Sequence, residues 1–260
     1  MSNIRQSAVA GMFYPGNPKD LDSTVKTFLN HARKSDSTPR AIIVPHAGYV
    51  YSGQVAAQAY KSLEPISDSI RRVVLLGPSH RVPFYGCALS SADYFATPLG
   101  NIPIDTSANA ALIQAGLART MDEAHALEHS LEVQLPFLQE VLSEFKLVPI
   151  VVGEAEAEEI AAILDFFWED KTTLFVISSD LSHYHPYEEA VQRDGITTES
   201  ILHFNSVSSH QACGCKPVNG LLVQAKKHHL SARLLELKNS GDTAGSKDQV
   251  VGYGAYAFYE

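Results

Sequence analysis

The chain has 260 residues, of which 45% are hydrophobic and 19% are charged, and this balance excludes a disordered polymer and predicts a globular protein. A chain of this length buries roughly 70–75% of its unfolded surface, so we expect one domain over residues 1–260 that needs neither disulfides nor a structural metal. The net charge of −9 and the lack of a Lys/Arg-rich run argue against nucleic-acid binding by charge.

Short β-branched runs alternate with longer helical patterns, which is typical of a layered α/β domain. Four runs without polar alternation are predicted as buried strands: Ala41–Pro45, Val73–Gly77, Leu147–Val152 and Thr173–Ser178. Helices are predicted at Asp20–Lys34, Gln54–Leu63, Thr106–Gly116, Ser130–Phe145, Ala155–Trp168, Tyr187–Phe204 and Val218–His229. The period-2 patterns of Ser231–Leu237 and Val251–Tyr259 favour late antiparallel strands, so the predicted sheet is mixed, mainly buried and flanked by helices.

The N-terminal residues MSNIRQSAVAGMFYPG lack the basic segment and apolar run of a signal peptide, and no apolar run approaches the ~18 residues of a membrane span. We therefore expect a soluble, cytoplasmic protein with no membrane partner. The three cysteines, Cys87, Cys213 and Cys215, are too few for a disulfide framework, so reduced thiols are expected. No GxGxxG, GxxxxGK[ST], GxSxG, HExxH or paired CxxC motif is present, so nucleotide phosphate binding has no support.

Three of the predicted strands run directly into polar side chains. His46 follows the first strand, His80 follows the second within PSH, and Asp180 and His183 follow the fourth within SSDLSH. Ligands of α/β sheets bind beyond the carboxyl ends of the parallel strands, so these four side chains are expected to converge on one crevice. Singly, each is more simply a hydrogen-bonded loop residue or a turn cap, but three strand ends with the same feature favour a site.

Two imidazoles and an anionic third ligand can hold a divalent metal and leave coordination positions open. Asp180 and Cys213 are both candidates for the third ligand. Cys213 precedes a predicted helix, whose N-terminal dipole favours a thiolate. Cys215 is a weaker candidate for the same role, and Cys87 is most simply a small buried hydrophobe.

The remaining histidines divide into one open case and a surface group. His129 precedes a predicted helix, and two interpretations are level: a helix-entry residue, or a contact to substrate or to a metal ligand. The others lie on helical or polar stretches and are predicted on the surface: His31, His125, His185, His203, His210, His228 and His229.

Seven unusual segments occur in a fixed order along essentially the whole chain: GMFYPG, RAIIVPHAGYVYSG, RRVVLLGPSH, ALSSADYFATPLG, EHSLEVQLPFL, VISSDLSHY and CGCKPVNGLL. In these segments the sequence resembles the Memo family (mediator of cell motility), whose prokaryotic members are called AmmeMemoRadiSam system protein B. The resemblance implies the α/β fold of the class III extradiol dioxygenases, with a mixed sheet and a metal crevice. It also implies a radical-SAM protein as a partner.

The resemblance assigns roles at matching positions. His46 and His80 match the two metal-binding histidines of the family, Cys213 matches its cysteine ligand, and Asp180 and His183 match further polar residues of the pocket. The related dioxygenases carry a glutamate where this chain has the cysteine. A thiolate donates more charge and is itself oxidisable, so catechol cleavage is not assumed, and Cys215 stays an alternative ligand.

The leading hypothesis is a metal-dependent oxidoreductase of dioxygenase-like type that acts on an unknown small or modified substrate. Fe(II) or copper, with zinc as a further option, would be held by His46, His80 and Cys213. His183 is the predicted general acid/base, and Asp180 is predicted to orient His183 or to contact a metal-bound water. The residues predicted to line the substrate pocket are His129, Tyr49 and Tyr184.

The alternative is a non-enzymatic signalling or adaptor protein that retains the crevice and binds a metal or a peptide there. Animal members of the Memo family are associated with motility signalling, which supports this alternative. A purely structural zinc site is disfavoured, because the candidate ligands number fewer than four and lie at an open face.

Overall fold

The computed structural model describes residues 2–35 and 37–260. The helices are α1 (Pro18–His31), α2 (Tyr49–Lys61), α3 (Thr106–Gln114), α4 (Asp122–Ala126), α5 (Leu135–Val141), α6 (Ala157–Phe166), α7 (Tyr187–Leu202) and α8 (Cys215–Lys227), with short 3-10 turns η1 (Glu64–Ile66), η2 (Glu132–Gln134) and η3 (Ser240–Asp242). The strands are β1 (Ile4–Arg5), β2 (Ala41–Val44), β3 (Arg72–Pro78), β4 (Cys87–Leu89), β5 (Tyr94–Thr97), β6 (Gly100–Pro103), β7 (Arg119–Thr120), β8 (Lys146–Val152), β9 (Thr173–Ser178), β10 (His183–His185), β11 (Ser231–Asn239) and β12 (Val250–Tyr259).

A mixed nine-stranded sheet organises the molecule. Its order is β10-β12-β2-β9-β3-β8-β4-β7, with β11 also paired to β12. The central strands β2, β9, β3 and β8 are parallel, whereas β12 and β4 run antiparallel to their neighbours β2 and β8. The predicted mixed, buried sheet is therefore confirmed, and the parallel centre places the ends of β2, β9 and β3 side by side.

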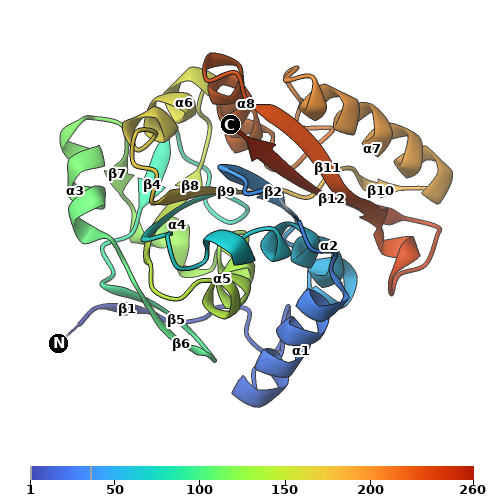
Figure 1. Ribbon diagram of the computed structural model, residues 1–260, viewed down its shortest axis with the longest axis horizontal. Coiled ribbons are helices and arrows are strands. Elements are labelled where there is room, and N and C mark those ends of the chain that lie inside the picture. The colour runs from blue at the N-terminus through green and yellow to red at the C-terminus, as the bar shows by residue number, and fades with distance from the viewer. Residues whose placement is uncertain (1, 36) are drawn as a thin grey trace.

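Helices cover both faces of this sheet, so its strands are apolar on both sides. In β2, the side chains of Ile42 and Val44 join the core on one face, together with residues of α1, α2 and α5. Ala41 and Ile43 alternate with them and join the core on the other face, together with residues of α6, α7 and α8. Figure 1 shows the first group of helices below the sheet and the second group above it.

Two predicted helices differ from the structure by more than three residues at one end. The helix expected at Ser130–Phe145 is replaced by η2 and the short α5, because Glu132 and Gln134 turn inward to make buried hydrogen bonds instead of covering a surface face. Helix α2 begins at Tyr49, five residues before the expected start at Gln54. Gly53 lies inside it, where a Cβ atom would be 2.5 Å from the ring of Phe28, so this glycine permits helix packing.

A small second sheet, with the order β1-β5-β6, was not predicted because its strands are only two to four residues long. It lies at the N-terminal end of the molecule (Figure 1). Arg5 of β1 forms a buried ion pair with Glu132 of η2. The Glu132 carboxylate also accepts hydrogen bonds from the backbone N–H groups of Ala8 and Val9 and from the Tyr14 hydroxyl. The N-terminal segment is therefore tied to the loop that precedes α5.

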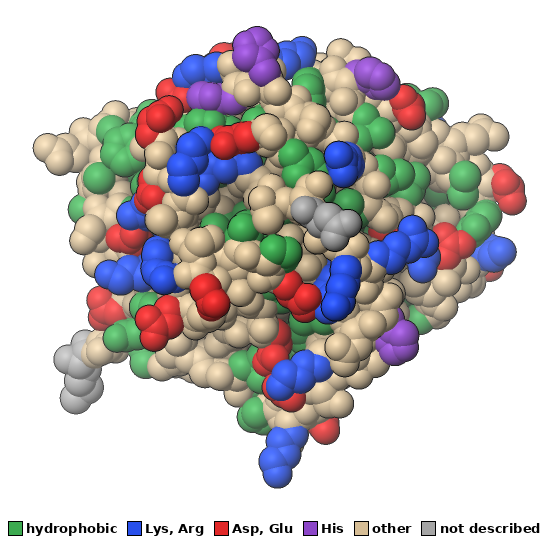
Figure 2. Space-filling view, viewed as in Figure 1, with side chains coloured by type: hydrophobic (Ala, Val, Ile, Leu, Met, Phe, Trp, Pro, Cys, Tyr) green, Lys and Arg blue, Asp and Glu red, His purple; other side chains and the backbone are tan. Residues whose placement is uncertain are grey.

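Positive and negative side chains are interspersed on the face of the molecule shown in Figure 2. Within residues 2–35 and 37–260, no helix has the length and apolarity needed to cross a membrane.

Candidate metal centre

The ligand atoms of His46, His80 and Cys213 lie within 4.8 Å of one another. His46 and His80 each stand two residues beyond the end of a parallel strand, β2 and β3, and Cys213 stands two residues before α8. The ring centroids of the two histidines are 5.1 Å apart. The structure thus brings together the three residues that the sequence singled out as metal ligands, from segments as much as 167 positions apart.

His46 is buried and its ring is held from both sides. Its Nδ1 atom lies 2.9 Å from the Ser178 hydroxyl, and its Nε2 atom lies 3.2 Å from the Cys213 sulfur. Burial, and then the nearby His80 and His129, lower the pKa of His46 well below its ordinary value. The imidazole is therefore neutral near pH 7, the form in which it binds a metal.

His80 is more exposed, and a buried carboxylate holds it. The His80 Nδ1 atom lies 2.9 Å from Glu128 Oε1, and the His80 backbone N–H donates to Oε2 at 2.6 Å. The backbone N–H groups of His129 and Ser130 also donate to Oε1. Burial alone raises the pKa of Glu128, but the hydrogen bonds from His80 and from the backbone N–H of Ser130 outweigh it, and this pKa is lowered to about 2. Glu128 is therefore ionised in the folded protein.

Cys213 supplies the third donor atom. Its backbone N–H donates to the Asp180 carbonyl, and the next residue, Gly214, donates to the Ser179 hydroxyl. Burial and then the Asp180 carboxylate raise the pKa of the Cys213 thiol. The helix-dipole effect expected from the sequence is thus outweighed, and in the absence of a cation the neutral thiol lies against His46 Nε2. A bound cation reverses this preference, because a metal-coordinating thiol loses its proton.

Cys215, the alternative thiol, begins α8 and packs in the core formed with α6. It is absent from the donor groups found among the described residues, whereas Cys213 is present.

His129 extends the cluster of rings. Its ring stacks on His80, with centroids 4.6 Å apart, and meets His46 edge-on at 5.5 Å. Phe13 packs against it from the N-terminal segment. Burial and then His80 lower the pKa of His129 to about 4. The helix-entry interpretation of His129 does not describe this position, because the residue lies in the loop between α4 and η2 and its ring contacts those of His46 and His80.

Asp180 lies in the loop after β9 and His183 begins β10, but their side chains do not hydrogen-bond to each other. Asp180 Oδ1 accepts the backbone N–H of His46 at 2.7 Å, and burial raises the pKa of Asp180 to about 6. His183 Nδ1 lies 2.8 Å from the Leu181 carbonyl, which can only accept, so Nδ1 carries the proton. The Leu181 carbonyl therefore orients His183, and Asp180 positions the loop that carries His46.

A cavity of about 540 Å³ opens over this cluster. Its lining includes His80, Cys213, His183 and Tyr184, together with His185, Arg193, Ser209 and His210. Tyr184 is 69% exposed and has a φ of 60°, a backbone conformation that is unusual for an aromatic residue. This cavity is the place where a substrate would meet the donor atoms.

Tyr49 lies elsewhere. It is buried among aromatic residues of the core, with its ring centroid 5.1 Å from that of Phe137, and its hydroxyl donates to the Val133 carbonyl. The structure therefore places Tyr49 beneath the site and not among the residues that line the cavity.

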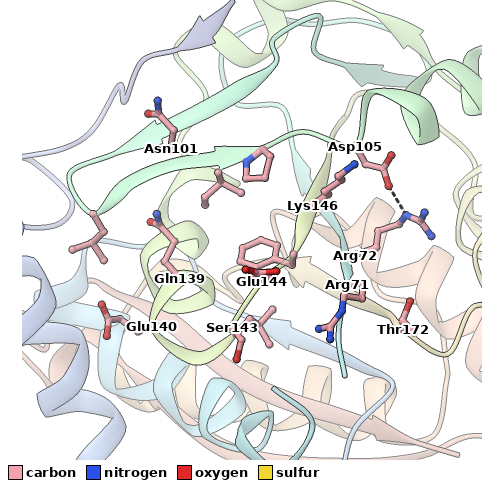
Figure 3. Close-up of a pocket in the computed structure, with 15 residues that line it drawn as sticks. Arg71, Arg72, Asn101, Asp105, Gln139, Glu140, Ser143, Glu144, Lys146 and Thr172 are labelled. Atoms are coloured by element: carbon pink, nitrogen blue, oxygen red, sulfur yellow. Dashed lines mark hydrogen bonds and ion pairs between the residues drawn. The ribbon is translucent and has the colours of Figure 1, made fainter. Parts of the chain in front are cut away.

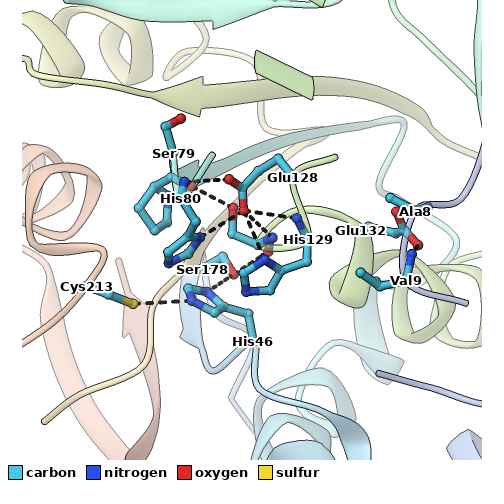
Figure 4. Close-up of polar contacts among 12 residues, drawn as sticks. Ala8, Val9, His46, Ser79, His80, Glu128, His129, Glu132, Ser178 and Cys213 are labelled. Atoms are coloured by element: carbon cyan, nitrogen blue, oxygen red, sulfur yellow. Dashed lines mark hydrogen bonds and ion pairs between the residues drawn. The ribbon is translucent and has the colours of Figure 1, made fainter. Parts of the chain in front are cut away.

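The prediction of a surface position is wrong for His125. Its side chain is buried, and its Nε2 atom lies 3.0 Å from the Ala88 carbonyl. Sequence reasoning also missed three residues that support the histidines: Glu128, Gln134 and Ser178. Figure 4 shows Glu128 beside His80 and Ser178 beside His46. A signal was present for Ser178, which is the last residue of its strand. Glu128 and Gln134 have no local signal, because the side chains that they contact, those of His80 and Ser178, lie far away in the sequence.

A second cavity, of about 830 Å³, lies at the opposite edge of the sheet, near the start of β3 and β8 (Figure 3). Its charged lining is partly neutralised within the protein, since Arg72 pairs with Asp105 and with Asp170. It does not contain any of the donor groups described above.

The fold and this site define an α/β protein with two histidines and a cysteine gathered at the carboxyl edge of its parallel strands. A family profile described as "Memo-like protein" matches residues 5–257. A "MEMO1 family protein" of Aquifex aeolicus (strain VF5) is 38% identical over 263 residues, which cover 96% of this chain and 97% of the relative. One of Methanosarcina mazei is 38% identical over 271 residues, which cover 97% and 98%. The chain belongs to the Memo-like family.

Among solved structures, an uncharacterized protein from Escherichia coli K12 has a TM-score of 0.53 and 11% sequence identity. The match covers 82% of this chain and 98% of that chain. This similarity shows a shared fold.

Proposed function

We propose that this protein is a metal-dependent oxidoreductase of dioxygenase-like type, with the metal held by His46, His80 and Cys213. The observation that carries the proposal is the convergence of their donor atoms within 4.8 Å beside an open cavity. Two imidazoles and one thiolate suit Fe(II), copper or zinc, and three protein ligands leave positions for substrate. Iron or copper bound there would supply the electron transfer that an oxidation needs.

The residues of the chain supply the remaining functions. His183 lines the cavity and has its Nδ1 proton committed to the Leu181 carbonyl, so its Nε2 atom can take a proton from a substrate and return it. Asp180 keeps His46 in place through the backbone N–H of that residue. Tyr184 lines the cavity beside the donor atoms, whereas His129 is not part of its lining and stacks on the ring of His80. Together these groups orient a small substrate and move its proton.

Anaerobic reconstitution tests the metal site. We expect the wild-type protein to bind close to one equivalent of Fe(II), Cu(I) or Zn(II), and His46→Ala and Cys213→Ala to bind far less. Cys215→Ala is the matched control, because its thiol, at the start of α8, is buried in the core. Metal binding by the wild type at the level of the two ligand variants would disprove the site.

Oxygen consumption then separates an enzyme from a binding protein. The iron- or copper-loaded protein is assayed with small aromatic diols and modified nucleobases, and His183→Gln is the matched variant that retains the ligands. Substrate-dependent oxygen uptake that falls in His183→Gln supports the oxidoreductase. Stoichiometric metal binding with no uptake for any substrate class favours the adaptor function.

A further inference from the structure

We propose that Glu128 and Ser178 are positioning residues that fix the tautomers of His80 and His46 before any metal arrives. The inference rests on the proposed function, because it concerns the two imidazole ligands of the proposed site. Each neutral imidazole has one protonated and one unprotonated nitrogen, and only the unprotonated one can bind a cation. Which nitrogen is unprotonated is decided by the hydrogen bond at the other.

For His46 the assignment follows from counting protons on Ser178. The Ser178 hydroxyl has one hydrogen, and it donates this hydrogen to the Ser130 carbonyl at 2.6 Å, since a carbonyl can only accept. The same oxygen accepts from Gln134 Nε2 at 2.9 Å. His46 Nδ1, also at 2.9 Å, must therefore donate, and the lone pair of His46 is on Nε2, the atom nearest to Cys213.

The orientation of Gln134 supports this count. Its Nε2 atom also donates to the Pro45 carbonyl at 2.8 Å, and its Oε1 atom accepts from the Tyr60 hydroxyl at 2.9 Å. The Pro45 carbonyl can only accept, so this contact requires the amide nitrogen, and not the amide oxygen, to face Ser178; the Tyr60 hydroxyl can then donate to the amide oxygen. The Ser178 oxygen consequently has no hydrogen left to offer to His46.

For His80 the determinant is a buried carboxylate. Glu128 Oε1 accepts the backbone N–H groups of His129 and Ser130, and Oε2 accepts that of His80. Because both oxygens act as acceptors, His80 Nδ1, 2.9 Å from Oε1, is the donor. The His80 lone pair is then on Nε2. The same carboxylate accepts the backbone N–H of Ser130, whose carbonyl accepts the Ser178 hydroxyl. The loop of residues 128–130 therefore influences both tautomers: it contains Glu128, which contacts His80, and its Ser130 carbonyl accepts the hydroxyl of Ser178, which contacts His46. Figure 4 shows Glu128 and Ser178 beside the two histidines.

The test is nitrogen NMR of the metal-free protein labelled with ¹⁵N-histidine, which reports the protonated nitrogen of each neutral ring. The His46 and His80 signals are assigned by their loss in His46→Gln and His80→Gln. We expect both rings of the wild type to be protonated at Nδ1. Ser178→Ala should change the tautomer of His46 alone, and Glu128→Gln that of His80 alone. Ser62→Ala removes another buried serine hydroxyl, one that donates to the Ala59 carbonyl at the end of α2, and should change neither.

The same variants are then titrated with Zn(II), used as a probe that needs no redox chemistry. Loss of one orienting partner should weaken Zn(II) binding by about 10- to 100-fold, and Ser62→Ala should bind like the wild type. An Nε2-protonated ring in the wild type would overturn the proposal. So would weaker zinc binding in both variants with unchanged tautomers, since that result indicates a merely structural role. If Glu128→Gln does not fold, the wild-type spectrum and Ser178→Ala still decide the question.

The outcome is separable from that of the proposed function. Tautomers are read without metal, and zinc affinity is read without oxygen. A protein that binds zinc through preset imidazoles but consumes no oxygen would retain this inference and lose the oxidoreductase.

Discussion

The position of Cys213 depends on the residue that follows it. Gly214 packs so tightly on the end of β9 that a Cβ atom would lie 2.6 Å from the Ser178 carbonyl oxygen and 2.6 Å from the Ser179 Cβ atom. Both obstacles belong to the segment that orients His46. The backbone can approach β9 this closely only without a side chain, which explains a glycine between the two cysteines.

Gly214→Ala should therefore lower stability and metal affinity together. Overpacking at such a site costs about 1–3 kcal/mol, and the displaced loop should move the Cys213 sulfur away from His46 Nε2. Urea unfolding of the metal-free protein measures the first effect, and a Zn(II) titration measures the second. Unchanged values in both measurements would show that the loop relaxes without moving Cys213.

At the scale of elements, the short strand β1 pairs with β5 over only two residues, and a buried ion pair is the main interaction that holds it in place. Arg5 pairs with Glu132, and the two side chains are 7% and 0% exposed. Arg5 also donates to the backbone carbonyls of His125 and Glu128. The N-terminal segment is in this way connected to the loop that carries Glu128 and His129.

Arg5→Ala should be strongly destabilising, because it leaves the Glu132 carboxylate buried without its cation. The expected loss is about 3–5 kcal/mol in the free energy of unfolding, measured by urea denaturation. Lys26→Ala is the control: Lys26 pairs with Asp22 and Glu140 at the surface, so its effect should be far smaller. Equal effects in the two variants would contradict this account.

Helix α7 contains a glycine with no packing role. Gly195 lies in its interior, and a Cβ atom there would meet nothing within 4 Å. Gly195→Ala should therefore stabilise the protein by about 0.5–1 kcal/mol, through reduced backbone entropy of the unfolded chain. The thermal midpoint of the variant should rise, with metal binding unchanged. A lower midpoint would indicate a contact that α7 makes only without a side chain at this position.

At the scale of the whole molecule, the central strands and the convergence of their ends were predictable, because buried runs such as Val73–Gly77 and the polar residues after them are adjacent in sequence. Residues that follow the carboxyl ends of parallel strands lie at the same edge of the sheet. His46 follows β2 and His80 follows β3, so the proximity of these two residues was predictable from local patterns. The contact of Glu128 was not predictable, because it is 48 positions from His80 and is connected to it only through the tertiary fold. The helix expected at Ser130–Phe145 was wrong for the same reason, because Glu132 and Gln134 hydrogen-bond to segments far away in the sequence.

The stability of the protein at acid pH should depend on His125, a buried residue that the sequence patterns predicted on the surface. Burial is the main factor that lowers the pKa of His125 from 6.5 to about 4. Arg5 also lowers it, whereas the Ala88 carbonyl, Asp122 and Glu128 raise it. Between pH 6.5 and pH 4 the unfolded chain therefore binds a proton at this residue that the folded chain does not, so stability falls as the pH falls through that window.

The size of the effect follows from the shift. A change of 2.5 in the pKa corresponds to about 3 kcal/mol. His125→Gln removes the titrating group and retains a donor toward the Ala88 carbonyl. Between pH 7 and pH 4 the free energy of unfolding should therefore fall less in His125→Gln than in the wild type, by up to about 3 kcal/mol. Urea denaturation at half-unit pH steps measures the two curves. His31→Gln, which alters an exposed histidine of α1, should run parallel to the wild type. If the His125→Gln curve is parallel as well, the buried imidazole accepts a proton in the folded state and the surrounding carboxylates outweigh its burial.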